Sequence, residues 1–259
     1  MLLATYSLWA RDIVRFYRQR SRIVGALGTP IVFWLLLGSG LGSSFRVSAD
    51  ASVNYLEYFY PGTLALIILF TAIFSTISLI EDRSEGFLQG VLVAPVPRAA
   101  IVMGKILGGT TLAALQAVLF LALAPVAGVE LSASALPLLA LVIIALAFAL
   151  TGLGFLIAWW LDSTQGFHAI MNLFLVPMWL LSGAVFPAEG AAGWIRAIMW
   201  ANPMTYGVSA LRAVLEGSAA AAAAGLPSLL TSVVVVLAFG GVTMAAGVIL
   251  VLVQRERTA

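Results

Sequence analysis

The most polar stretch of the chain is EDRSEGFLQGVLVAPVPR, residues 81–98, and its composition suits contact with a soluble partner. Three acids and an arginine lie between Glu81 and Glu85. Apolar side chains then recur at helical spacing on one face, and polar ones lie toward the other: Phe87, Leu88, Val91 and Leu92 against Asp82, Glu85 and Gln89. Pro95 and Pro97 stop the helix, because proline disfavours helix at the residue before it. The pattern predicts a short amphipathic helix and a turn, which either docks onto a partner or is an ordinary solvated loop.

The other charged residues disfavour ion-coupled transport. Carboxylates inside a membrane span are the usual mark of ion or proton coupling. All eleven Asp and Glu residues of the chain lie near the end of an apolar run or between two runs. Lys105 is the deepest charge within such a run, and its long side chain can reach the membrane interface. We therefore do not expect a proton- or sodium-driven carrier.

The sequence also lacks the residues that nucleotide, metal or thiolate chemistry needs. The one Gly-Lys pair, Gly104-Lys105, is followed by Ile106 and does not belong to a G-x-x-x-x-G-K-[ST] loop. The chain has no cysteine, and His168 is its only histidine, which predicts no metal site. We expect no cofactor in this chain. If an ATPase is attached to it, that ATPase has to be a separate polypeptide, which would bind ATP and Mg.

The composition is that of a membrane protein. Hydrophobic residues make up 62% of the chain and charged residues 9%, against about 25% charged residues in soluble proteins. Apolar runs of about 20 residues, enough to cross a bilayer as a helix, recur along the whole length. A net charge of +2 is too small to suggest nucleic-acid binding. Residues 1–259 therefore predict one all-α polytopic membrane domain.

Six membrane spans are predicted, preceded by an amphipathic helix over residues 4–22. That helix carries aromatic side chains on one side and arginines on the other, which suits the membrane interface, although a solvated leader is the alternative. Its arginines interrupt the apolar core that a cleavable signal needs. The region 187–226 is too polar for a span and too apolar for a solvated loop, and so predicts short re-entrant or interfacial helices. The spans are expected at residues 24–43, 59–80, 100–125, 135–160, 167–186 and 228–252.

Charge asymmetry predicts that both termini are cytoplasmic. With that orientation, ten Lys and Arg residues lie in or next to inside segments, and the three outside are Arg46, Arg196 and Arg212. Arginine greatly outnumbers lysine and alanine is abundant, which indicates a bacterial source and hence the bacterial plasma (inner) membrane.

Three stretches, in the same order, resemble ABC-2 type transporter permeases. EDRSEGFLQGVLVAPVPRAAIVMGKILGG resembles their first cytoplasmic loop, although Gln89 replaces the acid of the family's G-T-L-E-like turn. NLFLVPMWLLSGAVFP (172–187) resembles the pattern L-P-x-x-x-x-S-G-x-x-F-P, and NPMTYGVSALR (202–212) resembles N-P-x-T-Y-x-x-x-x-x-R. The resemblance covers essentially the whole chain and is closest to the drug, antibiotic and nodulation-factor export branch, the daunorubicin-resistance-like permeases.

The resemblance implies a transmembrane subunit that pairs with a second permease copy, as a homodimer, and docks two copies of a separate ATP-binding subunit. It assigns coupling to the ATPase to residues in 81–98: Glu81, Asp82, Arg83, Glu85, Gly86, Phe87, Leu88, Leu92, Pro95, Pro97 and Arg98. It places the substrate path at the dimer seam, with candidates in spans two and five: Phe70, Phe74, Asn172, Phe174, Pro177 and Met178. Contact with lipid or simple helix packing is the alternative for each of these six.

The break that Pro203 introduces suggests a further role at the outer side. Asn202 and Tyr206 flank it and are candidates for an outer gate, or for a turn that merely caps the loop. Together these features predict the non-enzymatic permease subunit of an exporter that moves an amphipathic drug, natural product or lipid-like substrate outward. An exporter of polysaccharide or glycolipid and a non-transporting membrane scaffold are the alternatives.

Overall fold

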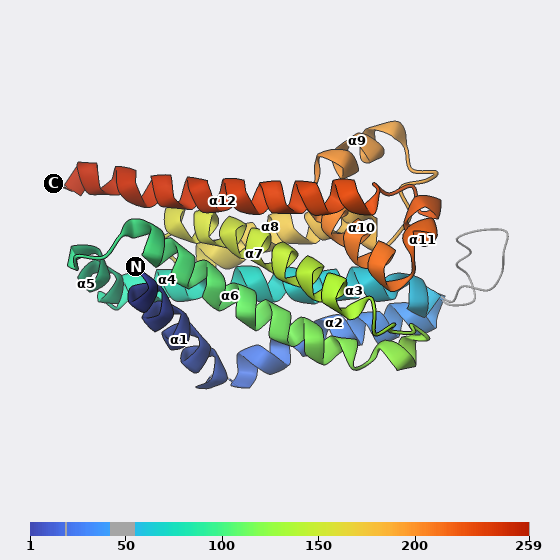
Figure 1. Cartoon of the computed structure of the whole chain (residues 1–259), viewed down its shortest axis with the longest axis horizontal. Coiled ribbons are helices and arrows are strands. Elements are labelled where there is room, and N and C mark those ends of the chain that lie inside the picture. The colour runs from blue at the N-terminus through green and yellow to red at the C-terminus, as the bar shows by residue number, and fades with distance from the viewer. Residues whose placement is uncertain (19, 42–54, 259) are drawn as a thin grey trace.

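The computed structural model describes residues 1–18, 20–41 and 55–258, and every regular element in them is a helix. The long helices run roughly side by side in an elongated bundle (Figure 1). The N-terminus and the C-terminal end of α12, Leu229–Thr258, lie at one end of the bundle. Three short helices lie at the other end: α9 (Gly193–Ala201), α10 (Pro203–Leu215) and α11 (Ser218–Ala223). The all-helical class is thus confirmed for the described residues.

Within the described residues, five helical segments are long and apolar enough to cross a membrane: Tyr55–Ser84, Arg98–Leu121, Leu136–Trp160, Thr164–Ala184 and Leu229–Val253. They overlap the second to sixth predicted spans. The first predicted span falls on α2, Arg20–Leu41, whose apolar stretch Leu27–Gly40 is shorter. That span was placed at 24–43, so its end lies outside the described residues and its crossing of the membrane stays a prediction.

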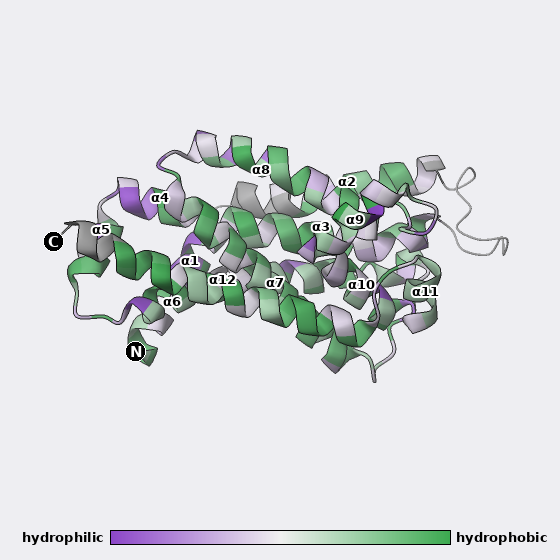
Figure 2. Cartoon of the chain, turned by 90° about the horizontal axis from the view of Figure 1, so that it is seen from above, coloured by the Kyte–Doolittle hydropathy of each residue, from purple (hydrophilic) through white to green (hydrophobic). Residues whose placement is uncertain are grey.

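Apolar residues cover the middle of the bundle, and hydrophilic residues concentrate toward its two ends (Figure 2). Among the polar parts is α4, Ile77–Ser84, close to the end where the termini lie. This distribution is the one that a bilayer requires, because charged groups are costly in the hydrocarbon region.

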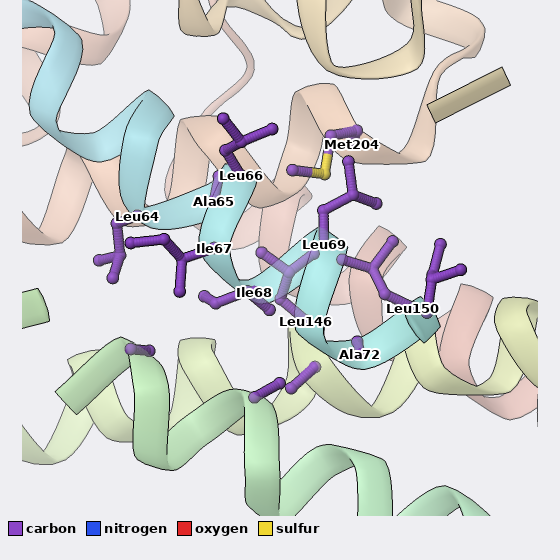
Figure 3. Packing of buried hydrophobic residues seen from close by; sticks show 14 of the residues in the cluster. Leu64, Ala65, Leu66, Ile67, Ile68, Leu69, Ala72, Leu146, Leu150 and Met204 are labelled. Carbon is purple, nitrogen blue, oxygen red and sulfur yellow. The ribbon is translucent and has the colours of Figure 1, made fainter. Parts of the chain in front are cut away.

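The core is built around α3, Tyr55–Ser75, which is buried along almost its whole length. It packs against α2, α6 (Arg98–Leu121), α7 (Leu136–Trp160) and α10. Figure 3 shows Leu69 of α3 close to Leu146 and Leu150 of α7, with Met204 of α10 nearby. Gly109 of α6 lets the helices approach closely, since a Cβ atom there would lie 2.2 Å from Ser75 Oγ of α3.

The segment after α3 is divided into two short helices. The family resemblance implies one coupling helix from Arg83 to Leu92, but α4 ends at Ser84 and α5 spans Phe87–Val93. Gly86 between them has φ +78°, a left-handed conformation that glycine adopts without steric penalty. Ala94 is extended ahead of Pro95, as proline requires of the residue before it.

The region 187–226, which is predicted to lie on the outer side, consists largely of short helices rather than an open loop. The preceding helix α8, Thr164–Trp179, ends in a π-helical turn, Leu180–Ala184, after which the chain turns into α9. Of the three short helices, α10 packs deepest, against α3, α7 and α12. A re-entrant course through the membrane stays a prediction.

Candidate coupling site

Asp82, in the last turn of α4, is the centre of a buried charge cluster. It is completely buried and accepts hydrogen bonds from three cations on two other helices. Arg11 and Arg15 reach it from α1, Leu2–Arg18, at 2.6 and 2.8 Å, and Lys105 Nζ reaches it from α6 at 2.6 Å. The carboxylate therefore joins α1, α4 and α6 at one point.

A second buried acid completes the junction between α1 and α6. Asp12 Oδ1 lies 2.8 Å from Lys105 Nζ, so this ammonium group bridges two carboxylates. Burial raises the pKa of Asp12 above its ordinary value, although Lys105 opposes the shift. The helices come this close because α6 carries glycines one turn apart: a Cβ at Gly104 would lie 2.9 Å from Leu8 Cβ, and one at Gly108 would lie 3.1 Å from Asp12 Cβ.

Further contacts from α1 extend to the start of α5. Arg15 Nη2 lies 3.0 Å from carboxylate oxygens of both Glu81 and Glu85. The guanidinium of Arg11 stacks over the ring of Phe87, 3.7 Å from its centroid. Arg11 and Arg15 of the amphipathic helix α1 therefore contact the acidic segment within the protein, and do not only face the environment around the protein.

Arg83 connects the same segment to the end of α7. Its guanidinium donates to the carbonyl oxygens of Trp159 and Leu161 at 2.9 and 3.3 Å, and to Asp162 Oδ1 at 2.8 Å. Carbonyls at a helix C-terminus have no partner within the helix, so Arg83 satisfies two of them. Arg83 thus links α4 to the α7–α8 connection.

The side chains of residues 81–98, the predicted coupling segment, do not all have the exposure that the predicted amphipathic helix implies. Asp82 is buried and does not share an exposed edge with Glu85 and Gln89, because the cations of α1 and α6 draw it inward. Leu88, which belongs to α5, is buried as the apolar face of the predicted helix requires. The exposed members next to the Gly86 turn are Ser84, Glu85, Gly86, Phe87 and Gln89.

The six candidate path residues fall into two groups. Phe70 and Phe74 line a cavity of about 670 Å³ between α2, α3 and α8, which His168 also borders. Four do not line it and lie on α8, the first three exposed and the last half-buried: Asn172, Phe174, Pro177 and Met178. The cavity wall is largely aromatic and aliphatic, and among the described residues it contains no carboxylate.

The outer candidates hold the corner between α9 and α10 against α8. Asn202 Nδ2 donates to the carbonyl oxygens of Met178 and Leu181 at 2.6 and 3.0 Å, and its Oδ1 accepts from the Met204 amide. It is thus the N-cap of α10, with Pro203 at the first helical position, where proline is favoured. Tyr206 Oη donates to the Trp200 carbonyl at 2.8 Å.

Arg212 is a functional candidate that the sequence analysis missed as a site residue, although it closes the 202–212 stretch. It is almost fully buried, donates to the Tyr58 carbonyl at 2.8 Å and stacks over the Tyr58 ring. Its second partner is Glu216, 2.9 Å away, whose pKa burial raises to about 7. The sequence analysis also missed the inward roles of Arg11, Asp12, Arg15 and Lys105. An acid within the arginine-rich helix, and a lysine among glycines one turn apart, were the available signals.

These features define a helical, multi-pass membrane protein whose short polar segment is tied to several long helices. Residues 4–215 match the family model described as ABC-2 type transporter, and the chain belongs to this family. Members of the family generally work with ABC ATP-binding subunits.

Named relatives of the chain are transport permeases or nodulation proteins. The putative transport permease ycf38 of Cyanophora paradoxa is 25% identical over 80% of this chain and 72% of its own length. Nodulation protein J of Rhizobium meliloti (strain 1021) is 27% identical over 82% and 81%. The daunorubicin resistance ABC transporter permease protein DrrB1 of Streptomyces coeruleorubidus is 24% identical over 82% and 74%.

Proposed function

We propose that this chain is the transmembrane subunit of an ABC exporter in the bacterial inner membrane. In this proposal α2 is the first of six spans and both termini are cytoplasmic. Two copies of the chain form a homodimer, and each copy docks one ATP-binding subunit through residues 81–98. ATP and Mg bind to those subunits, and this chain supplies the path.

The observation that carries the proposal is the arrangement around Asp82. The exposed turn at Glu85 and Gly86 adjoins a fully buried carboxylate, which in turn bonds to α1 and α6. Arg83 adds a connection to α7. A partner that moves the exposed turn therefore acts on several long helices at once, which is what transmission of a power stroke requires.

The cavity beside Phe70 and Phe74 supports an amphipathic substrate. Its wall combines aromatic rings such as Phe33 with a few hydroxyl groups such as Thr71 and Ser75. Apolar pockets with few polar groups favour ligands that bury mostly apolar surface. We therefore infer a drug-like, natural-product or lipid-like substrate, and the name of the daunorubicin resistance relative agrees with that choice.

The test is ATPase stimulation in proteoliposomes that contain this chain and the ATP-binding subunit that co-purifies with it. Glu85→Arg reverses an exposed charge at the turn, and Gly86→Pro forbids its left-handed conformation. Glu189→Arg, an exposed acid in the loop before α9, is the matched control.

We expect both turn variants to reach the membrane but to lose substrate-dependent ATP hydrolysis, and the control to retain it. Normal substrate-dependent ATP hydrolysis in both turn variants contradicts the coupling role. A chain that never binds an ATP-binding subunit is instead a scaffold, and stimulation by polysaccharide or glycolipid alone excludes the proposed substrate class.

A further inference from the structure

A second cavity, of about 930 Å³, lies beneath α5 at the end of the bundle that carries the termini. Its walls come from five places: Arg83 of α4, α5 with the proline-containing turn, the start of α6, the end of α7 and the last part of α12. It is separate from the cavity beside Phe74 and shares none of its lining residues.

The level of this groove in the membrane can be inferred from the ends of three spans that line it. Arg98 is the first residue of the segment Arg98–Leu121, and Trp159 lies one residue before the end of Leu136–Trp160. Soon after Leu252 the sequence continues with Gln254, Arg255 and Glu256, where the last apolar run ends. Span ends lie where hydrocarbon meets water, and tryptophan is enriched at that level. The groove therefore opens at the membrane boundary and not in the aqueous phase.

Its charge is one-sided. Arg83 and Arg98 line the groove with the amide of Gln89, and no carboxylate lines it among the described residues. Arg83 already has Asp162 as a partner. The Nη1 of Arg98 is buried and has no hydrogen-bond partner. Arg98 as a whole is only half-buried and lines the groove, so an anion there can pair with its guanidinium, which no carboxylate among the described lining residues neutralises.

The backbone adds to this preference for an anion. Arg98 begins α6, and the first amides of a helix have no partner within it, while the helix dipole places positive charge there. The remaining wall is apolar, with Leu88, Leu92 and Val251 among its members. A ligand that carries both a phosphate group and an acyl chain fits this groove, because the phosphate pairs with Arg98 and the acyl chain contacts the apolar wall.

We propose that this groove binds an anionic phospholipid of the adjacent leaflet, with its phosphate at Arg98 and part of an acyl chain along α12. Basic pockets between transmembrane helices are known to take anionic head groups. The proposal is independent of the transported substrate. It would place a lipid directly against α5, the helix that follows the exposed turn.

The experiment is native mass spectrometry of the full-length, delipidated chain in detergent, titrated with palmitoyl-oleoyl phosphatidylglycerol. Arg98→Gln removes the unpaired guanidinium. Gln89→Glu adds a negative charge at the exposed rim without disturbing a buried residue. Arg196→Gln removes an exposed arginine on α9, at the opposite end, and is the matched control for charge.

We expect one tightly bound phosphatidylglycerol per chain, and about tenfold weaker binding in Arg98→Gln, since a charge-assisted hydrogen bond is lost. Gln89→Glu should weaken binding severalfold by charge repulsion. Arg196→Gln should bind like the wild type, and palmitoyl-oleoyl phosphatidylcholine should bind more weakly to every variant that keeps Arg98.

Three results overturn the proposal. Equal losses in Arg98→Gln and Arg196→Gln would mean unspecific attraction between opposite charges. Displacement of phosphatidylglycerol by an equal concentration of inorganic phosphate would mean a free-phosphate site. Unchanged phosphatidylglycerol binding in Arg98→Gln would exclude Arg98 as the phosphate site, and failure of the same variant to co-purify with the ATP-binding subunit would mean that a protein covers the groove.

Discussion

Asp82 of α4 and Lys105 of α6 form a 2.6 Å ion pair in which both side chains are almost completely buried. Charges are seldom buried without partners, because removal from water costs several kcal/mol per ion. The ion pairs with Arg11, Arg15 and Asp12 that surround this pair offset the free-energy cost of its desolvation. The stability of the cytoplasmic end in our proposal therefore depends on one carboxylate.

Removal of the Asp82 charge should strongly destabilise the protein. Asp82→Asn leaves three cations without their shared acceptor, and we expect a loss of about 3–5 kcal/mol in the free energy of unfolding. Asp162→Asn is the control, since that side chain is 88% exposed and its pair with Arg83 should contribute about 0–1 kcal/mol. Unfolding of the detergent-solubilised variants measures both, and equal effects would refute the central role of Asp82.

A side chain at Gly104 should push α1 away from α6. In Gly104→Val the new Cβ would lie 2.9 Å from Leu8 Cβ and 3.0 Å from the Thr5 carbonyl oxygen, so α1 has to move. Because the chain has no cysteine, spin labels at Ser7→Cys and Leu115→Cys report the α1–α6 distance directly. We expect a longer and broader distance distribution in Gly104→Val. Gly241→Val, with no atom within 4 Å of its Cβ, should leave the distribution unchanged.

Loss of Arg83 should loosen the α7–α8 connection. Arg83→Ala removes the donors to the Trp159 and Leu161 carbonyls, so the amides of residues 160–164 should exchange faster with deuterium. Hydrogen-exchange mass spectrometry compares this peptide with peptides from the middle of α7, which should not change. Faster exchange throughout α7 would indicate general unfolding and would contradict a local role.

Stability should depend on pH through Glu216. The pKa of Glu216 is about 7 in the folded protein, and the ordinary value for glutamate is 4.5. Between these two pH values the folded protein therefore binds more protons than the unfolded protein. The free energy of unfolding should therefore fall as pH rises from about 4.5 to about 7, and the contribution should be complete below that range. Glu216→Gln should flatten this part of the profile in thermal unfolding. Glu189→Gln, an exposed acid, should leave the slope as in the wild type.

Much of the fold could be predicted from local pattern. Apolar runs of sufficient length mark the spans from Tyr55 to Val253, because length and hydrophobicity alone decide whether a helix can cross a bilayer. The break at Gly86 could not be predicted in this way. Glycine is also tolerated inside helices, and only the contacts of α4 and α5 with their neighbours select its left-handed conformation.

The site was harder to predict than the spans. The sequence indicates that residues 81–98 are polar and lie between two spans, but not which acids turn inward. Asp82 and Glu85 are both acids of one short segment, and Arg15 contacts both. The cations that contact Asp82 but not Glu85 are Arg11, 71 positions earlier, and Lys105, 23 positions later. Arg212 presents the same difficulty, since its partner Tyr58 is 154 residues away.

The burial of α3 has a mechanical consequence. This helix is about 30 Å long at 1.5 Å per residue, and it is buried along almost its whole length, apart from the side that faces the cavity beside Phe70 and Phe74. At its outer end the Tyr55 and Tyr58 hydroxyls bond to the carbonyls of Val185 and Gly183, and the Trp179 indole bonds to the Gly62 carbonyl. Such a helix behaves as a stiff rod, so in our proposal a displacement delivered near Asp82 is passed along α3 toward Tyr55 and Tyr58.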